Sequence, residues 1–124
     1  MIDHVNIPVS NLNTSELFYS EVLKTLGFSL LLRDSDAIGY GKHSWEFGIV
    51  RENAGFTLLH LAFKAISHDA VRAFYHTAIE MGARDNGAPG AREHYGPHYY
   101  SAFVYDLNGH NIEAVCRNTN GTEL

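Results

Sequence analysis

The stretch DHVNIPV at residues 3–9 has a counterpart in LHLAF at residues 59–63, and this correspondence decides the fold. Each stretch is followed by an aromatic pair, which is Phe18-Tyr19 in the first copy and Phe74-Tyr75 in the second. The two pairs are 56 positions apart. A repeat at one fixed separation indicates an internal duplication. We therefore interpret the chain as two copies of one strand–helix unit.

The two copies place a histidine at the same position, His4 in the first and His60 in the second, again 56 positions apart. The glycines expected to end the two helices, Gly27 and Gly82, are one residue closer together. A duplicated unit can bring its two histidines into one shared cleft, and two converging imidazoles are half of a metal site. A lone strand histidine is more often structural or exposed, so the hypothesis depends on the pairing.

The bulk composition is that of an ordinary globular protein and argues against several classes of function. The chain has 124 residues, 45% of them hydrophobic and 19% charged, which suits a single domain over residues 1–124. The formal net charge of −5, without a basic stripe, argues against nucleic acid as a partner. The single cysteine, Cys116, fits a reducing compartment. No apolar run in the chain reaches about 18 residues, and the first residues do not resemble a signal peptide, so we expect a cytoplasmic protein that does not span a membrane.

The first module, about residues 1–55, predicts a strand, a helix and three more strands. Alternating side chains predict a strand at residues 2–9, and the helical spacing of apolar residues from Phe18 to Leu26 predicts a helix. We expect Asn13 to cap the start of this helix. Three shorter strands are expected at residues 28–33, 37–41 and 45–51.

The second module, about residues 56–124, repeats this order. It predicts a strand at residues 56–64, a helix that begins at Ser67 or His68-Asp69, and a hairpin formed by residues 98–106 and 110–117. The polar stretch RDNGAPG at residues 84–90 is rich in turn formers and is typical of a loop. The sequence therefore predicts an α+β fold of two tandem βαβββ modules, in which each helix covers the apolar face of its strands.

These residues resemble the vicinal oxygen chelate superfamily, which includes glyoxalase I, bleomycin-resistance proteins, fosfomycin-resistance proteins and extradiol dioxygenases. The resemblance rests on IDHV at residues 2–5, on LHLAF at residues 59–63 and on DLNGHNIE at residues 106–113. The family often has Asp-Pro-Asp-Gly in the third motif, from which Leu107-Asn108 departs conservatively. Small bacterial glyoxalase-like members are similar also in the RDNGAPG loop and in the NIEAVC ending at residues 111–116.

The resemblance implies that the modules form a cupped mixed sheet with the helices outside, usually as a homodimer. It also implies that a divalent metal ion, Zn, Ni, Mn or Fe, is held in the cup by His4, His60 and Glu113. A set of two histidines and one carboxylate leaves coordination positions open for substrate oxygens, and these ligand types do not select among the four metals.

Glu46 is a candidate catalytic residue because of the same resemblance. Trp45-Glu46 echoes Ile112-Glu113 across the repeat, where glyoxalase I has its second metal glutamate and general base. A register slip of one residue would turn the Glu46 side chain away and leave an ordinary edge-strand carboxylate.

The segment of residues 93–100 is dense in imidazole and phenol groups. It would supply a proton donor at the cup mouth, with His94 and Tyr99 preferred, or serve as an aromatic packing and turn segment. We expect substrate contacts from four further residues, Asn6, Tyr40, Arg92 and Tyr100. Four histidines expected in turns or on the exposed side of a helix receive no role: His43, His68, His76 and His110.

The leading hypothesis is a metal-dependent enzyme that acts on a small molecule with adjacent oxygens, by lyase or isomerase chemistry through a metal-stabilised enolate. One alternative is a protein of the bleomycin-resistance type that sequesters a small molecule or drug without catalysis. A second alternative is a fosfomycin-type thiol transferase, for which Arg84 and Arg92 are the evident phosphonate ligands. One scaffold carries several chemistries, so the fold alone does not choose among them.

Overall fold

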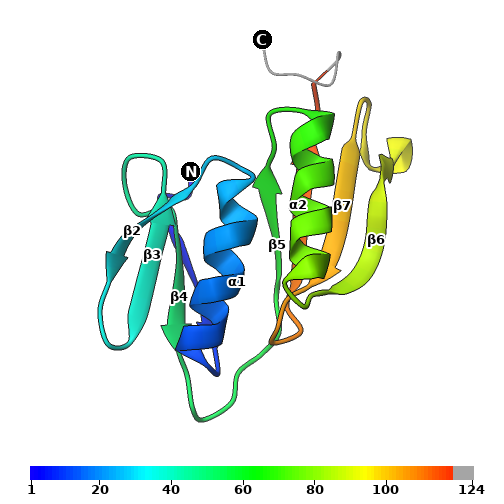
Figure 1. The fold of residues 1–124 in the computed structure, drawn as a ribbon. Coiled ribbons are helices and arrows are strands. Elements are labelled where there is room, and N and C mark those ends of the chain that lie inside the picture. The colour runs from blue at the N-terminus through cyan, green and yellow to red at the C-terminus, as the bar shows by residue number, and fades with distance from the viewer. Residues whose placement is uncertain (119–124) are drawn as a thin grey trace. The chain divides into compact units, whose positions relative to one another are not determined.

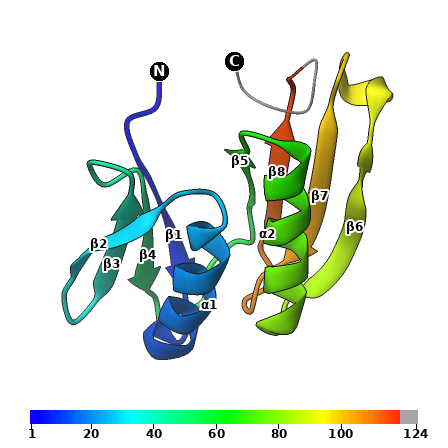
Figure 2. The same cartoon turned by 45° about the horizontal axis from the view of Figure 1, so that its top comes forward.

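The chain folds into two compact units, Met1–Thr57 and Leu58–Leu124. A computed structural model describes residues 1–118, and the two units are described separately below. Each unit has one four-stranded mixed sheet and one α-helix in the order β-α-β-β-β, which confirms the predicted tandem modules. Figures 1 and 2 show each helix lying along one face of the sheet of its own unit.

The first unit contains β1 (Val5–Val9), α1 (Leu12–Lys24), β2 (Ser29–Arg33), β3 (Ala37–Gly41) and β4 (Phe47–Arg51). The strand order is β1-β4-β3-β2, with β1 parallel to β4 and the other neighbours antiparallel. The four strands predicted in this half are all present, although β1 begins three residues and β4 two residues later than expected.

The start of α1 differs from the prediction by two residues. Asn11, not Asn13, is the N-cap, and its side-chain oxygen accepts a hydrogen bond from the Thr14 backbone N–H at 3.0 Å. That bond satisfies one of the four N–H groups that a helix leaves without partners at its start. Both residues are asparagines, so the residue type alone could not choose between them.

The core of the first unit lies between α1 and one face of the sheet. Alternate residues of the strands point to this face, and the helix contributes an apolar stripe with the spacing that the sequence predicted. Each large side chain that is fully buried here contributes roughly 1.5–3 kcal/mol to folding. The buried members are Ile7, Val9, Phe18, Tyr19, Val22, Leu23, Ile38, Tyr40, Phe47 and Ile49.

The second unit contains β5 (His60–Lys64), α2 (His68–Glu80), β6 (Arg84–Ala91), a short 3₁₀ helix (Glu93–Tyr95), β7 (Tyr100–Tyr105) and β8 (Asn111–Cys116). Its strand order, β5-β8-β7-β6, repeats that of the first unit, with β5 parallel to β8. Ser67 is the N-cap of α2, as predicted, and β7 and β8 form the expected hairpin. Asn108-Gly109 makes its turn, where Gly109 has a φ of +95°.

The predicted loop at residues 84–90 is wrong, because these residues form the edge strand β6. Its register against β7 shifts on either side of Gly87, whose φ is +146°. An edge strand tolerates Pro89, because the missing N–H falls on the side that needs no partner. The turn-forming residues therefore mark an irregular strand.

The two sheets have the same register, which identifies equivalent positions by structure. In the first unit Asn6 pairs with Gly48, which pairs with Gly39. In the second unit Ala62 pairs with Glu113, which pairs with Phe103. Because Asn6 and Ala62 are 56 positions apart, Gly48 is the structural counterpart of Glu113.

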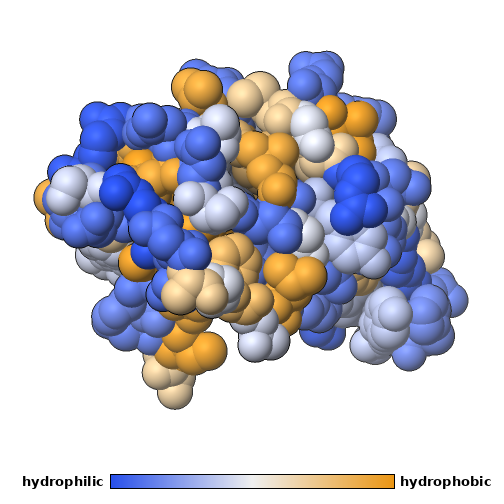
Figure 3. All heavy atoms as spheres, turned by 90° about the horizontal axis from the view of Figure 1, so that it is seen from below, coloured by the Kyte–Doolittle hydropathy of each residue, from blue (hydrophilic) through white to orange (hydrophobic). Residues whose placement is uncertain are grey.

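The surface mixes polar and apolar side chains. Figure 3 shows hydrophilic and hydrophobic residues interspersed on the face seen from below. Among residues 1–118, no helix is both long and apolar enough to cross a membrane.

Candidate functional site

Glu113 is a buried carboxylate on β8, on the face of the sheet opposite α2. Its neighbours Ile112 and Ala114 point into the core under α2, and the alternation of the strand turns Glu113 to the other side. Glu113 is nevertheless only 2% exposed. A buried carboxylate is costly unless it is paired and hydrogen-bonded. Its contacts therefore define the candidate site.

Both oxygens of Glu113 have partners from the same unit. His60 Nε2 lies 2.9 Å from Oε1, and the Tyr99 hydroxyl donates a short hydrogen bond to Oε2. His60 begins β5 and lies two residues from Ala62, which pairs with Glu113 across the parallel strands. His60 and Ala62 share a face of the sheet, so the imidazole extends towards the carboxylate. The predicted ligands His60 and Glu113 are thus brought together.

Tyr99 lies immediately before β7 and is 7% exposed. Burial, followed by the hydrogen bond to Glu113, raises the pKa of Tyr99 to about 12. The phenol therefore stays protonated near neutral pH and acts as a donor to the carboxylate. The sequence prediction placed Tyr99 at the site as a catalytic group, and the structure places it against Glu113.

A pocket of about 320 Å³ opens over this cluster. Three of its lining residues were not assigned to the site from the sequence: Tyr95, Phe103 and Arg117. Phe103 could have been found by alternation, because it shares a face of β7 with Ser101 and pairs with Glu113. Arg117 follows β8, and its guanidinium lies over the Tyr99 ring at 4.7 Å.

His60 and Glu113 are of residue types that bind divalent metal ions. Imidazole nitrogen and carboxylate oxygen bind such ions at roughly 2.0–2.2 Å. In this structure the two groups contact each other directly, with 2.9 Å between Nε2 and Oε1, which is a hydrogen-bond distance. Among the described residues, no three His, Cys, Asp or Glu side chains gather closely enough to hold a metal ion. The second unit therefore offers two of the three predicted ligands.

His4 immediately precedes β1 in the first unit, and its exposed side chain has Nδ1 2.8 Å from Asp3 Oδ1. It lines a hollow of the first unit together with Asn6 and Trp45. The Trp45 indole N–H donates to Asn6 Oδ1 at 2.9 Å. Asn6, a predicted substrate contact, is thus engaged within its own sheet.

The predicted equivalence of Glu46 with Glu113 is wrong by two residues, because the register makes Gly48 the counterpart of Glu113. Glu46 precedes β4, and its carboxylate accepts a hydrogen bond from the Lys42 backbone N–H at 3.0 Å. The sequence comparison missed this because the loop before β4 and the turn before β8 differ in conformation. The catalytic role of Glu46 stays a prediction.

Tyr40 corrects a second expectation. Tyr40 was expected to contact substrate, but it is fully buried on the face that α1 covers. Its hydroxyl lies 3.1 Å from Ser20 Oγ, and burial raises its pKa to about 12. Because side chains alternate along a strand, Gly39 and Gly41, and not Tyr40, lie on the opposite face.

The other predicted site residues lie around the second unit. The Arg92 guanidinium donates to the main-chain carbonyls of Ala88, Gly90 and Ser101. The exposed imidazole of His94 packs against the Tyr95 ring at 4.2 Å. Among these contacts, those of Arg92 hold the irregular edge strand in place.

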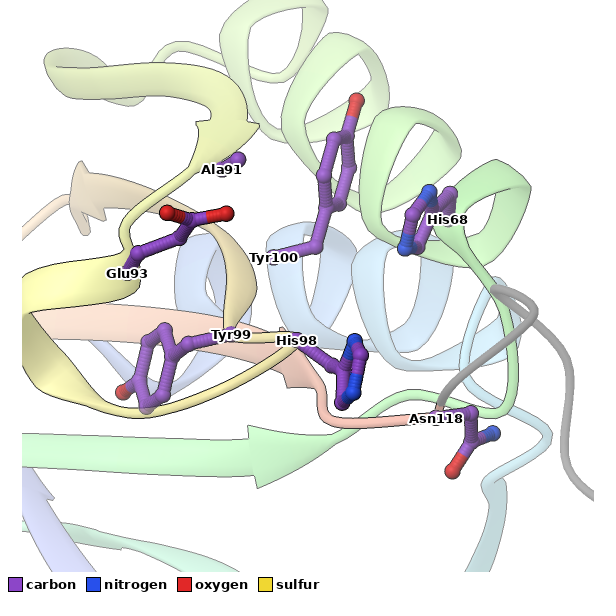
Figure 4. Close-up of a pocket in the computed structure, with 7 residues that line it drawn as sticks. All are labelled: His68, Ala91, Glu93, His98, Tyr99, Tyr100 and Asn118. Carbon is purple, nitrogen blue, oxygen red and sulfur yellow. The ribbon is translucent and has the colours of Figure 1, made fainter.

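Tyr100 lies near a second hollow of this unit, of about 80 Å³. Figure 4 shows the rings of Tyr99 and Tyr100 pointing to different sides of the strand, so that Tyr100 lies beside α2. The His68 imidazole stacks on the Tyr100 ring at 3.9 Å, and Arg72 donates to the Tyr100 hydroxyl at 3.0 Å. Tyr100 is therefore separated from Glu113 by the strand itself.

The four histidines without a predicted role include one that is fully buried. His110 was expected in a turn without a role, but it is fully buried, and its Nδ1 accepts a hydrogen bond from the Leu59 backbone N–H at 3.2 Å. This bond joins the β7–β8 turn to the residue that precedes β5. The structure therefore indicates a structural role for His110.

No protein-family model and no curated protein matches this chain. Solved structures do match. A glyoxalase/bleomycin resistance protein from Albidiferax ferrireducens T118 is 28% identical, with a TM-score of 0.83, covering 95% of this chain and 99% of its own. A glyoxalase-related enzyme from Fulvimarina pelagi is 17% identical, with a TM-score of 0.74, covering 98% and 95%.

A glyoxalase/bleomycin resistance protein/dioxygenase family enzyme from Burkholderia phytofirmans PsJN has a TM-score of 0.71 at 21% identity, covering 94% of this chain and 98% of its own. These neighbours confirm the predicted resemblance to the vicinal oxygen chelate superfamily and its fold. The three-residue metal set, the homodimer and the cytoplasmic location stay predictions.

Proposed function

We propose that the chain is a divalent-metal-dependent enzyme that acts on a small molecule with adjacent oxygens, by lyase or isomerase chemistry. The observation that carries the proposal is the buried Glu113 carboxylate, whose Oε1 lies 2.9 Å from His60 Nε2 at the floor of a pocket. In this proposal His60 and Glu113 of the second unit are metal ligands, and the third ligand predicted from the sequence, His4, is tested separately. A bound divalent ion would act as a Lewis acid that stabilises negative charge on substrate oxygens.

The residues around the ligands have separate tasks. Tyr99 donates to Glu113 Oε2, so that Oε1 is the carboxylate oxygen directed towards His60. Hydrogen-bonded partners of this kind orient ligating groups and tune their basicity. The rings of Tyr95 and Phe103 line the pocket and would provide contact area for a ligand.

A second candidate is a protein that sequesters a small molecule without catalysis. The observation that favours it is that both Glu113 oxygens already have partners inside the protein, His60 and Tyr99. Such a carboxylate is satisfied without a metal ion. The aromatic walls of the pocket would then hold the ligand by stacking and apolar contact.

Metal content separates the two candidates. The parent protein, purified without chelators, and three variants would be analysed by plasma mass spectrometry after incubation with Zn²⁺, Ni²⁺, Mn²⁺ or anaerobic Fe²⁺. We expect near-stoichiometric metal in the parent and at least tenfold lower affinity for His60→Ala and Glu113→Gln, because each variant removes a ligand. His4→Ala tests the third ligand.

His76→Ala is the matched control, because His76 is exposed on α2 and does not line the pocket. It should keep the metal affinity of the parent. A parent that takes up none of the four metals would overturn the enzyme proposal and favour sequestration. Equal losses in His76→Ala and His60→Ala would assign the metal to nonspecific histidine binding.

A further inference from the structure

We propose that Arg117 recognises an anionic group of the ligand, so that the substrate carries a carboxylate or phosphate beside its adjacent oxygens. This inference rests on the proposed function, because it names the substrate class of the same pocket. Arg117 follows β8 and lines the pocket with His60 and Glu113. The pocket therefore places a cation near the two proposed metal ligands.

The donors of Arg117 have no acceptor among residues 1–118. Its one described interaction is with the face of the Tyr99 ring, 4.7 Å away. Stacking occupies the flat side of a guanidinium and leaves the N–H groups at its edge available. Those donors form a rigid fork that matches the two oxygens of a carboxylate or phosphate.

Glu113 is not the acceptor that Arg117 lacks. Its two oxygens are taken by His60 and Tyr99, and it is 2% exposed. The other lining groups are the Phe103 ring and the neutral Tyr95 phenol. Arg117 is thus the charged donor of this lining that has no acceptor among residues 1–118, which calls for an anionic acceptor on the ligand.

The other arginines of this unit are engaged differently. Arg92 donates to main-chain carbonyls, and Arg72 contacts Asp69 and the Tyr100 hydroxyl. Arg84 also stacks on a tyrosine, with its guanidinium 4.9 Å from the Tyr105 ring centroid, but it does not line the pocket. Arg84 is therefore a matched control for Arg117, with the same charge and the same kind of ring contact.

Three probes that share a hydroxyketone group test the proposal. Dihydroxyacetone is neutral, hydroxypyruvate adds a carboxylate, and dihydroxyacetone phosphate adds a phosphate. Their dissociation constants would be measured by isothermal titration calorimetry on metal-loaded and chelator-treated protein. We expect at least one anionic probe to bind the parent about tenfold more tightly than dihydroxyacetone, because a charged fork adds strong hydrogen bonds. The anionic probe that binds more tightly shows whether the site prefers a carboxylate or a phosphate.

The variants decide whether Arg117 causes this preference. Arg117→Gln should lose most of the tenfold gain, Arg117→Lys should keep part of it, and Arg84→Gln should keep all of it. Equal binding of charged and neutral probes by the parent would overturn the proposal, as would equal losses in the Arg117→Gln and Arg84→Gln variants. An Arg117-dependent preference that persists in a parent without bound metal would support the anion site while the proposed enzyme function fails.

Discussion

The two units share one topology and one register, yet they treat the same position of the sheet in opposite ways. In the first unit Gly48 occupies the central position of the face that α1 does not cover, and the Trp45 ring lies over it. In the second unit Glu113 occupies that position and is buried under His60 and Tyr99. The repeat therefore supplies a scaffold twice, while the buried carboxylate is specified in one copy.

The difference is also one of packing tolerance. A Cβ on Gly48 would stand 2.3 Å from Asn6 Oδ1 and 2.6 Å from the Trp45 ring, so no side chain larger than hydrogen fits without movement. Glu113 instead has a full side chain whose polar atoms are satisfied by a basic and a phenolic group. Duplication alone thus does not produce two equivalent sites.

Removing the carboxylate should have the largest effect on stability. Glu113→Ala leaves the buried Tyr99 hydroxyl without its acceptor and opens a cavity, so we expect a loss of about 3 kcal/mol in the free energy of unfolding. Urea denaturation of the metal-free protein measures it. Glu46→Ala, which removes an exposed carboxylate of the first unit, should change that free energy little. Equal losses would erase the distinction between the units.

Adding a methyl group to the first unit should have the next largest effect. Gly48→Ala forces the indole and the Asn6 side chain to move, at a cost of about 2 kcal/mol. The same denaturation experiment, with the Trp45 indole N–H followed by NMR, detects both changes. Gly90→Ala serves as control, because its new Cβ meets no atom closer than 3.9 Å. An unchanged indole resonance in Gly48→Ala would contradict the described packing.

Removing the hydroxyl of Tyr99 should cost less than removing Glu113. Tyr99→Phe keeps the ring but takes one hydrogen bond from a buried carboxylate, for a loss of about 1.5 kcal/mol. Metal affinity should also fall several-fold, because Glu113 loses the group that orients it. Tyr95→Phe is the matched control, since Tyr95 is exposed. A metal affinity unchanged in Tyr99→Phe would remove Tyr99 from the site.

The two buried phenols allow a finer comparison in alkali. Burial is the main cause that raises the pKa of both Tyr40 and Tyr99 to about 12, from an ordinary value of 10.0. Between these values the unfolded chain has lost protons that the folded protein retains, so the free energy of unfolding falls as pH rises from 10 to 12. Tyr40→Phe and Tyr99→Phe should each make this fall shallower. If the free energy of unfolding of a variant falls with pH as steeply as that of the parent, the phenol removed in that variant does not contribute to the fall.

The sequence was sufficient to predict the order of strands and helices, because apolar residues recur along the chain at regular spacings. Alternating apolar residues and the 56-residue repeat predicted both modules and their helices, and the structure confirms them. The repeat indicated His60 and the family resemblance indicated Glu113, and the structure brings these two residues together. The two residues come into contact because β5 and β8, the strands that carry the two motifs, pair with each other.

The errors arose where single residues determine conformation. The register around Glu46 depends on the conformation of the loop at residues 42–46. A loop has no repeating pattern of side chains from which its conformation could be predicted. The face of the sheet on which Tyr40 lies is set by the alternation of side chains along β3. Its neighbours are glycines, which have no side chain to mark the opposite face. Arg117 was missed because its partner, the face of the Tyr99 ring, is not encoded by any local spacing.

Trp45 is the one tryptophan of the chain, and it lies over the glycines of the first sheet with its indole N–H bound to Asn6. The protein therefore carries an intrinsic fluorophore in one of its two repeats. Light at 295 nm excites indole selectively, so its emission reports on the packing of the Met1–Thr57 unit. Circular dichroism reports on the helices of both units. Comparing the two signals during unfolding would show whether the halves of this duplicated chain melt together or in turn.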